Sequence, residues 1–282
     1  MALAGGTLVR PRLRGANWSC SDFGVESQII ETEFGPIPLK GRFGSDGPVL
    51  LLIRGAFADP EMLGHLPDHL PAGWSGVAAN LPGSFGGPPL RAVSVDVFAQ
   101  GFSAVVRTAL TNRKVVVLGL SVGGLVAMAM RAAEIRRLIL VDPPLSTGKA
   151  WALKHRILPI LRTLGPDDPG RQFASSVLGV AEDRLEDRSY YHLLRNLDVP
   201  ADLMLGDVPL APPRTLDNLP CLNDAEDIAR YRSHPMVSCH IMEGAGHNIP
   251  AQAPLPFLRI VHDACARAGD DSAATARQNR SP

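Results

Sequence analysis

Apolar positions along the chain form two recurring patterns. Short continuous apolar runs are typical of strands buried on both faces of a parallel sheet, and the first half of the chain has such runs at residues 48–55, 76–79, 115–118 and 138–141. Between the second and third runs, the apolar residues of 93–110 recur every three or four positions, as on one face of an amphipathic helix. Alternating strands and helices predict an α/β fold with a doubly wound, mostly parallel sheet.

Two segments depart from this alternation. Residues 28–44 contain two extended stretches that turn near Gly35 and Pro36, which predicts an antiparallel hairpin, because Pro fits poorly inside a central strand. Residues 147–197 have helical periodicity, several charges and no convincing strand, which predicts a helical insertion. The alternation then resumes, with strands predicted at 202–207 and 236–242 and helices near 223–232 and 254–267.

These patterns predict one α/β core that is interrupted by one insertion. The expected parts are an N-terminal arm at 1–27, the core at 28–145 and 200–268, the helical insertion at 146–199 and a tail at 269–282. The tail is rich in small and polar residues, so we expect it to be disordered.

Positive and negative charges balance in this chain. The 28 basic and 28 acidic residues give a formal net charge of zero. Proteins that bind nucleic acid or anionic membranes usually carry an excess of positive charge, so we expect a small-molecule substrate and no nucleic acid.

No apolar run approaches the ~20 residues that cross a bilayer, and the start of the chain lacks the pattern of a secretion signal. We therefore expect no membrane span and a cytoplasmic location, whereas no pattern indicates an oligomeric state.

The cysteines and histidines show no metal-binding spacing. The four cysteines are scattered without a C-x-x-C pair, so we expect ordinary thiols and neither a zinc site nor a disulfide scaffold. Cys239 and His240 are adjacent, but they lie within a predicted strand, where such residues usually fill the sheet. We expect no metal and no organic cofactor.

A nucleophile motif lies between the third apolar run and a helix-like segment. Gly119, Ser121 and Gly123 form a G-x-S-x-G pattern. In a nucleophile elbow, a sharp strand-to-helix turn raises the serine hydroxyl above the sheet, and the flanking glycines let neighbouring backbone pass. The following helix also points its positive end and free N–H groups toward a developing oxyanion. The sequence therefore predicts Ser121 as a nucleophile.

Two other interpretations of this segment stay open. The same residues resemble a dinucleotide-binding G-x-G-x-x-G with Asp142 at the end of the next strand, but Ser121 occupies the position whose missing side chain lets backbone approach a pyrophosphate. The segment is also compatible with an ordinary strand-to-helix turn.

A serine hydroxyl needs a base to remove its proton. Among the eight histidines, only His247 follows the last predicted strand in a small, flexible loop and comes after the serine in the chain. The sequence therefore predicts His247 as the general base.

Four segments in order carry a family resemblance: PVLLLIRGAF, VVVLGLSVGG, RLILVDP and EGAGHNIP. Together they resemble the α/β-hydrolase superfamily over roughly residues 28–268, with the insertion in the place of that family's cap. The resemblance implies a carboxylate after the strand that precedes the histidine, which points to Asp207. It also implies an oxyanion hole made of the backbone N–H groups of Val122 and of Ala56 or Phe57.

The chain departs from the family pattern at two positions. The family commonly has Gly-x-x-Asp after that strand, whereas here Asp207 follows Gly206 directly, so Asp142 stays open as the alternative acid. Arg54 stands where the family typically has His, which brings a cation near the site or merely pairs with a surface carboxylate.

The sequence thus predicts a serine hydrolase that cleaves a carboxylic ester or thioester of a small, partly apolar molecule through a Ser-His-Asp triad. The alternative is a catalytically weak or inactive α/β-hydrolase-fold protein that binds small molecules. The distance from His247 to Asp207 and Asp142 discriminates between them, because a histidine beyond hydrogen-bond reach of both favours the binding protein.

Overall fold

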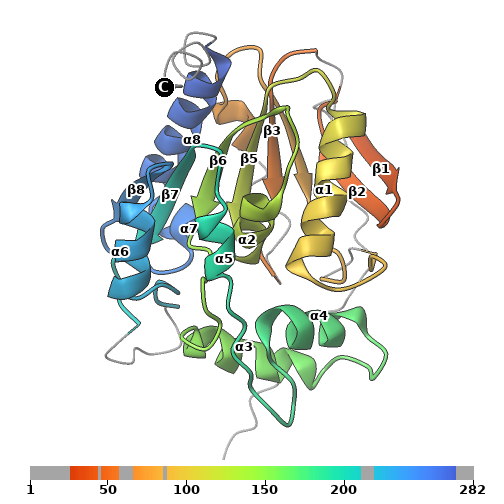
Figure 1. The fold of residues 1–282 in the computed structure, drawn as a ribbon, viewed down its shortest axis with the longest axis vertical. Helices are drawn as coiled ribbons and strands as arrows, with labels where there is room; N and C mark the ends of the chain where they lie inside the picture. Colours follow the sequence, from red (N-terminus) through yellow and green to blue (C-terminus); the bar gives the residue numbers. More distant parts are fainter. Residues whose placement is uncertain (1–25, 44–45, 57–65, 85–87, 211–218, 271–282) are drawn as a thin grey trace, which may run out of the picture.

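The computed structural model describes residues 26–43, 46–56, 66–84, 88–210 and 219–270 (Figure 1). The predicted arm up to residue 25 and the tail after residue 270 lie outside the described residues. None of the helices in the described residues combines the length and the hydrophobicity of a membrane span.

One eight-stranded sheet forms the centre of the molecule, in the order β1-β2-β4-β3-β5-β6-β7-β8. Among the described strands, the β1–β2 and β2–β4 pairs are antiparallel, and every pair from β4 to β8 is parallel. The strands are β1 (Glu26–Thr32), β2 (Gly35–Gly41), β3 (Val49–Ile53), β4 (Ser75–Ala79), β5 (Val115–Leu120), β6 (Ile135–Val141), β7 (Ala201–Gly206) and β8 (Val237–Met242). The predicted doubly wound α/β sheet is confirmed.

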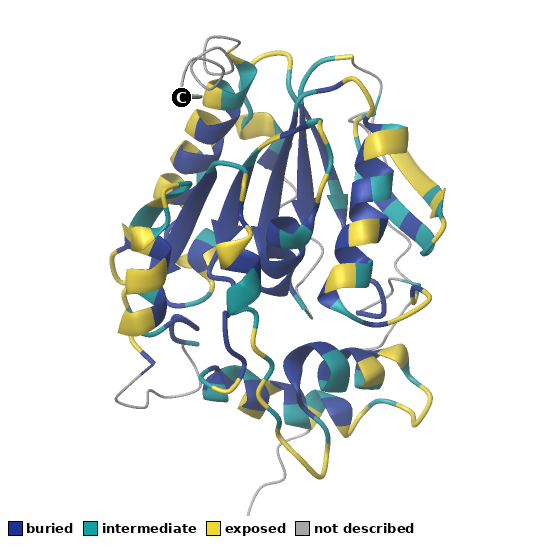
Figure 2. Ribbon diagram, viewed as in Figure 1, coloured by how far each residue is buried: buried dark blue, intermediate teal, exposed yellow. Residues whose placement is uncertain are grey.

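Helices cover both faces of the sheet. Along β3, alternate residues belong to different apolar clusters: Leu51 packs with α1 and α2, and Leu52 packs with α8. Figure 2 shows the central strands buried, while α1, α6 and α8 turn exposed residues outward. The helices outside the insertion are η1 (Leu66–His69), α1 (Val95–Ala109), α2 (Val122–Ala129), α6 (Ala225–Ser233), α7 (Ile249–Gln252) and α8 (Pro254–Gly269).

Helices also form the segment between β6 and β7. They are α3 (Trp151–Leu161), α4 (Pro169–Leu178) and α5 (Tyr191–Arg195). Helices α3 and α4 lie beyond the edge of the sheet at which α2 begins (Figure 1). The ring of Phe173 on α4 stacks on Phe98 of α1, with centroids 5.9 Å apart and planes 9° apart. The insertion is therefore packed on the core as a cap, as the fold prediction expects.

The first hairpin differs slightly from its prediction. Its turn lies at residues 33–34, and Gly35 and Pro36 begin β2. The Thr32 hydroxyl accepts a hydrogen bond from Phe34 N at 3.2 Å and donates one to Gly35 O at 2.7 Å. This side-chain hydrogen bonding closes the turn before the Gly-Pro pair, and β2 then pairs with β1 from Gly35 onward.

Candidate active site

Ser121 occupies the sharp turn between β5 and α2. Its backbone angles, φ 53° and ψ −119°, are unusual for a residue with a side chain and store strain at this turn. The turn is tight because the backbone of Gly123 passes directly over β3, where an added Cβ would overlap the carbonyl oxygen of Ile53. This is the local geometry that the G-x-S-x-G pattern predicts.

Two of the three predicted oxyanion-hole residues, Val122 and Ala56, are among the described residues near this turn. Val122 is buried and begins α2, and the Ser121 side chain makes no capping hydrogen bond to that helix. Gly55 runs beside the serine, since a Cβ added there would lie 3.2 Å from the Ser121 Cβ. Ala56 follows Gly55 and is partly buried, whereas Phe57 lies outside the described residues.

His247 lies in the loop that follows β8. Its backbone N–H donates to Leu219 O at 2.9 Å. The loop crosses the end of β7 so closely that a Cβ at Gly206 would overlap the carbonyl oxygens of Ala245 and Gly246. This crossing carries the imidazole past β7 toward the end of β6.

At the end of β6, the imidazole meets a buried carboxylate. Nδ1 of His247 lies 2.7 Å from Oδ2 of Asp142, and the Asp142 side chain has no exposed surface. Asp142 also has a positive φ of 42°. Because β5 and β6 pair in parallel up to Leu120 and Val141, Ser121 and Asp142 leave neighbouring strand ends on the same edge of the sheet.

The carboxylate that the family resemblance implies, Asp207, does not contact His247. Its Oδ1 accepts a hydrogen bond from the backbone N–H of Gly244 at 2.8 Å, and its own N–H donates to Met242 O at 3.3 Å. Asp207 therefore still pairs with the end of β8 and closes the turn that follows that strand. Among the described residues, it makes no hydrogen bond to the histidine, and Asp142 occupies the partner's place.

Ser121 and His247 are not hydrogen-bonded to each other within the described part of the chain. Such contacts are often long in ligand-free enzymes and tighten only when substrate binds. Arg54, the second departure from the family pattern, donates from Nη1 to Asn80 Oδ1 at 2.9 Å.

Three consecutive residues before α6 hold the Asp142 carboxylate. Cys221 Sγ lies 3.1 Å and Asn223 Nδ2 lies 2.7 Å from Oδ1, and the Leu222 N–H donates to Oδ2 at 2.8 Å. Burial, together with the negative charge of Asp142, raises the pKa of the Cys221 thiol far above its usual value, so it stays a neutral donor. From the sequence, Cys221 is expected to be an ordinary thiol, because no local pattern connects it to a residue 79 positions away.

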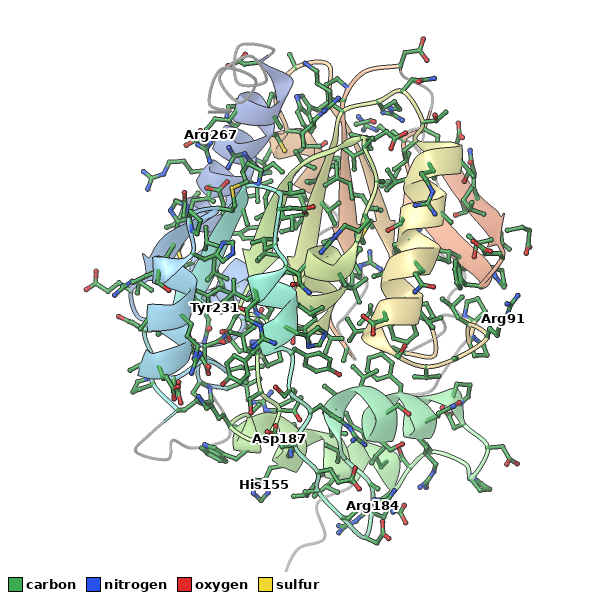
Figure 3. All side chains as sticks on the ribbon, in the orientation of Figure 1. Arg91, His155, Arg184, Asp187, Tyr231 and Arg267 are labelled. Carbon is green, nitrogen blue, oxygen red and sulfur yellow. The ribbon has the colours of Figure 1, made fainter. Side chains whose placement is uncertain are left out.

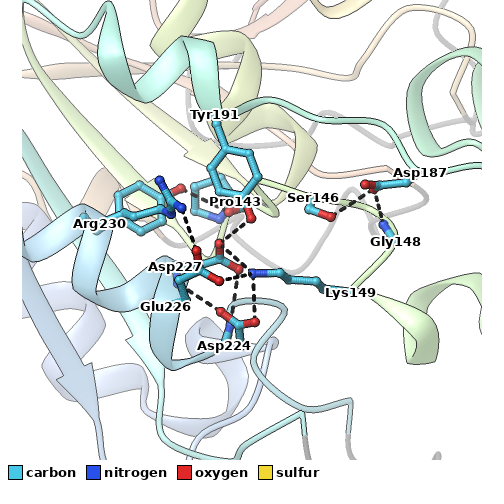
Figure 4. Close-up of polar contacts among 11 residues, drawn as sticks. Pro143, Ser146, Gly148, Lys149, Asp187, Tyr191, Asp224, Glu226, Asp227 and Arg230 are labelled. Carbon is cyan, nitrogen blue, oxygen red and sulfur yellow. Dashed lines mark hydrogen bonds and ion pairs between the residues drawn. The ribbon is translucent and has the colours of Figure 1, made fainter.

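The next residues of the same segment tie the cap to the core (Figure 4). Lys149, just before α3, lies 2.8 Å from Asp224 and 3.2 Å from the buried Asp227. Tyr191, at the start of α5, donates to the same Asp227 oxygen at 2.7 Å. Although burial favours the neutral amine, the hydrogen bond to Asp224 and the charge of Asp227 raise the pKa of Lys149. Both ends of the cap are thus anchored at the first turn of α6.

Another buried aspartate lies at the amino end of the sheet. Asp202, near the start of β7, contacts Arg137 and Arg267 at 2.9 Å each and His240 at 3.0 Å. His240 is therefore a hydrogen-bond partner of this buried carboxylate. Across the described residues, no group of three or more His, Cys, Asp and Glu side chains is arranged to hold a metal ion.

Comparisons with known proteins agree with this architecture. A thermophilic esterase from Thermogutta terrifontis superposes with a TM-score of 0.63 at 18% identity, covering 87% of this chain and 100% of the esterase. The naproxen esterase of Bacillus subtilis gives 0.60 at 19% identity, covering 84% and 90%. The thioesterase domain of the curacin biosynthetic pathway gives 0.56 at 19% identity, covering 84% and 98%. At these identities the similarity shows a shared fold.

A search of curated protein sequences returned no significant match. The family model described as the alpha/beta hydrolase family matches residues 50–260, which include Ser121, Asp142 and His247. This match spans most of the chain, and the chain belongs to the alpha/beta hydrolase family.

Proposed function

We propose that the protein is a serine hydrolase in which Ser121, His247 and Asp142 form the catalytic triad. Ser121 Oγ attacks an acyl carbonyl while His247 takes its proton, and Asp142 holds the imidazole by accepting its Nδ1–H and stabilises the imidazolium. The backbone N–H groups of Val122 and Ala56 stabilise the oxyanion. After the leaving group departs with the proton from His247, the same base activates water to release the acyl group.

The observation that carries this proposal is the 2.7 Å contact between His247 Nδ1 and the fully buried Asp142 carboxylate. A buried carboxylate is costly unless it is paired, and this one faces the only predicted base of the site. The strained backbone of Ser121 at the adjacent strand end supports the same assignment, because strained residues that surroundings hold in place are concentrated at functional sites.

We further propose a carboxylic ester or thioester of a small, partly apolar molecule as the substrate. The similar structures include two proteins described as esterases and one described as a thioesterase domain, which supports this bond type. A binding protein without catalytic activity is the competing function. The contact between His247 and Asp142 argues against it, because that pairing orients the imidazole and stabilises its protonated form, as a general base requires.

The test is the reaction of the protein with a fluorophosphonate probe, followed by measurement of the mass of the intact chain. An activated serine reacts rapidly and with one probe per chain, whereas an ordinary surface serine does not. We expect labelling of the natural chain and loss of labelling in both Ser121→Ala and His247→Ala.

Two matched variants control for the loss of a hydroxyl and of an imidazole. Ser233→Ala removes a hydroxyl that bonds to Arg230 O at the end of α6, and His262→Ala removes an exposed imidazole on α8. Both should label like the natural chain. A folded natural chain that does not react would overturn the hydrolase and favour the binding protein; a labelled natural chain can then be screened against esters and thioesters.

A further inference from the structure

We propose that Cys221 and Asn223 are positioning residues, which hold the Asp142 carboxylate in the orientation that His247 needs. This inference rests on the proposed function and assigns the segment before α6 a role in it. Neither residue belongs to the triad, and each would act only through Asp142.

The four donors around Asp142 divide between its two oxygens. Cys221 and Asn223 both point at Oδ1, at 3.1 and 2.7 Å. The Leu222 N–H and His247 Nδ1 both point at Oδ2, at 2.8 and 2.7 Å. Rotation of the carboxylate would break several of these bonds at once, so the oxygen that faces the imidazole is fixed.

The donors of the segment are neutral. A thiol, a backbone amide and a carboxamide stabilise the carboxylate without cancelling its charge, unlike an arginine or a lysine. The full charge of Asp142 therefore remains available to the imidazolium that forms when His247 takes the serine proton. A cation in this place would hold the carboxylate equally well but would oppose that imidazolium.

Asn223 is poorly explained by packing alone. Its side chain is buried, and its Oδ1 has no hydrogen-bond partner among the described residues. A buried unpaired carbonyl is unfavourable, and an apolar residue of similar size would avoid that cost. The amide nitrogen offsets this cost through its short bond to Asp142.

The segment itself is fixed on both sides of Asn223. The Cys221 N–H donates to Val208 O at 2.9 Å, and Asp224 and Asp227 form a capping box at the start of α6. Further along the helix, the Tyr231 hydroxyl donates to Pro143 O, next to Asp142, at 3.2 Å. Figure 3 shows Tyr231 on the side of α6 that faces the centre of the molecule. The donors are therefore held against the end of β6 before substrate binds.

The test compares Asn223→Leu, Cys221→Ala and Cys221→Ser in the full chain. We measure the rate of fluorophosphonate labelling by intact mass and the downfield proton resonance of the His247–Asp142 hydrogen bond, assigned by its loss in His247→Ala. Asn223→Leu and Cys221→Ala should each lower the labelling rate about tenfold and shift the resonance, because each removes one donor to a buried charge. Cys221→Ser keeps a donor and should restore most of the rate.

Cys265→Ala is the matched control, because Cys265 is equally buried but lies on α8 in the apolar cluster of the opposite face. It should change neither the rate nor the resonance. Folded Asn223→Leu and Cys221→Ala variants with the natural rate and an unshifted resonance would overturn the inference. If the natural chain does not label, the proposed function fails, and the resonance alone then decides whether the segment positions Asp142.

Discussion

The two ends of the sheet each bury an aspartate that touches a histidine. Asp142 follows β6 at the carboxyl edge and contacts His247, and Asp202 lies near the start of β7 at the amino edge and contacts His240. Both carboxylates are almost completely buried. Arg267, a partner of Asp202, lies at the far end of the molecule from the cap residue Asp187 (Figure 3).

The two carboxylates differ in the partners that they have besides the histidine. Asp202 is neutralised by Arg137 and Arg267, and although burial opposes its charged form, the hydrogen bond from His240 and these two cations lower its pKa. Asp142 instead receives a thiol, a backbone amide and a carboxamide. One site resembles a structural ion-pair cluster, and the other keeps a buried charge directed at a single imidazole. The type of donor therefore distinguishes a stabilising carboxylate from a proposed catalytic one.

The largest effect that we expect is on the reactivity of Ser121 in Asp142→Asn. The amide no longer stabilises the imidazolium and favours the wrong imidazole tautomer, so labelling and ester turnover should fall by about 10³- to 10⁴-fold. Asp207→Asn is the matched control and should change the rate less than about threefold, because surface substitutions away from a site have small effects. Equal losses of rate in the two variants would show that Asp207 also takes part in the reaction.

Asp202→Asn should affect stability rather than reactivity. It leaves Arg137 and Arg267 without their buried carboxylate, and breaking a buried ion pair costs about 3 kcal/mol. Urea denaturation should show this loss of unfolding free energy, while the labelling rate of the folded variant stays that of the natural chain. An Asp202→Asn variant with a lowered labelling rate but an unchanged unfolding free energy would contradict the distinction between the two carboxylates.

The stabilisation by Asp202 should depend on pH in a defined direction. Since folding lowers the pKa of this carboxyl, its contribution is fully present above the pKa of the unfolded state and is lost as the pH falls through the folded value. The difference in unfolding free energy between the natural chain and Asp202→Asn should therefore shrink as the pH falls below about 4. A difference that persists unchanged into strong acid would contradict the ion-pair explanation.

The smallest effect should come from Arg267→Gln. The side chain of Arg267 is 47% exposed, and Arg137 still neutralises Asp202 in its absence. We expect a loss below about 1 kcal/mol, reduced further by salt, as for other solvent-exposed ion pairs. Urea denaturation at low and high ionic strength measures it. A larger, salt-independent loss would show that the cluster acts as one unit.

Local features were predictable from the sequence. The apolar runs mark β3, β4, β5 and β6, and the resumed alternation predicts β7 and β8. The G-x-S-x-G turn and the loop of His247 are both identified by residues that are adjacent in the chain. These features depend on backbone sterics and on burial, which act within a few residues.

The partner of His247 was not predictable in this way. The family pattern favours Asp207, but the loop over Gly206 carries the imidazole past β7 to Asp142, 105 residues earlier in the chain. Cys221 and Asn223 escaped prediction for the same reason. Both belong to a segment whose only link to Asp142 is spatial.

The sequence by itself determined the order of strands and helices, the candidate nucleophile and the candidate base, because each is written in a short pattern of neighbouring residues. Only the tertiary structure decided which carboxylate meets His247 and which side chains hold that carboxylate. Those contacts depend on how separate loops cross at one edge of the sheet, and a one-dimensional pattern carries no distance between them.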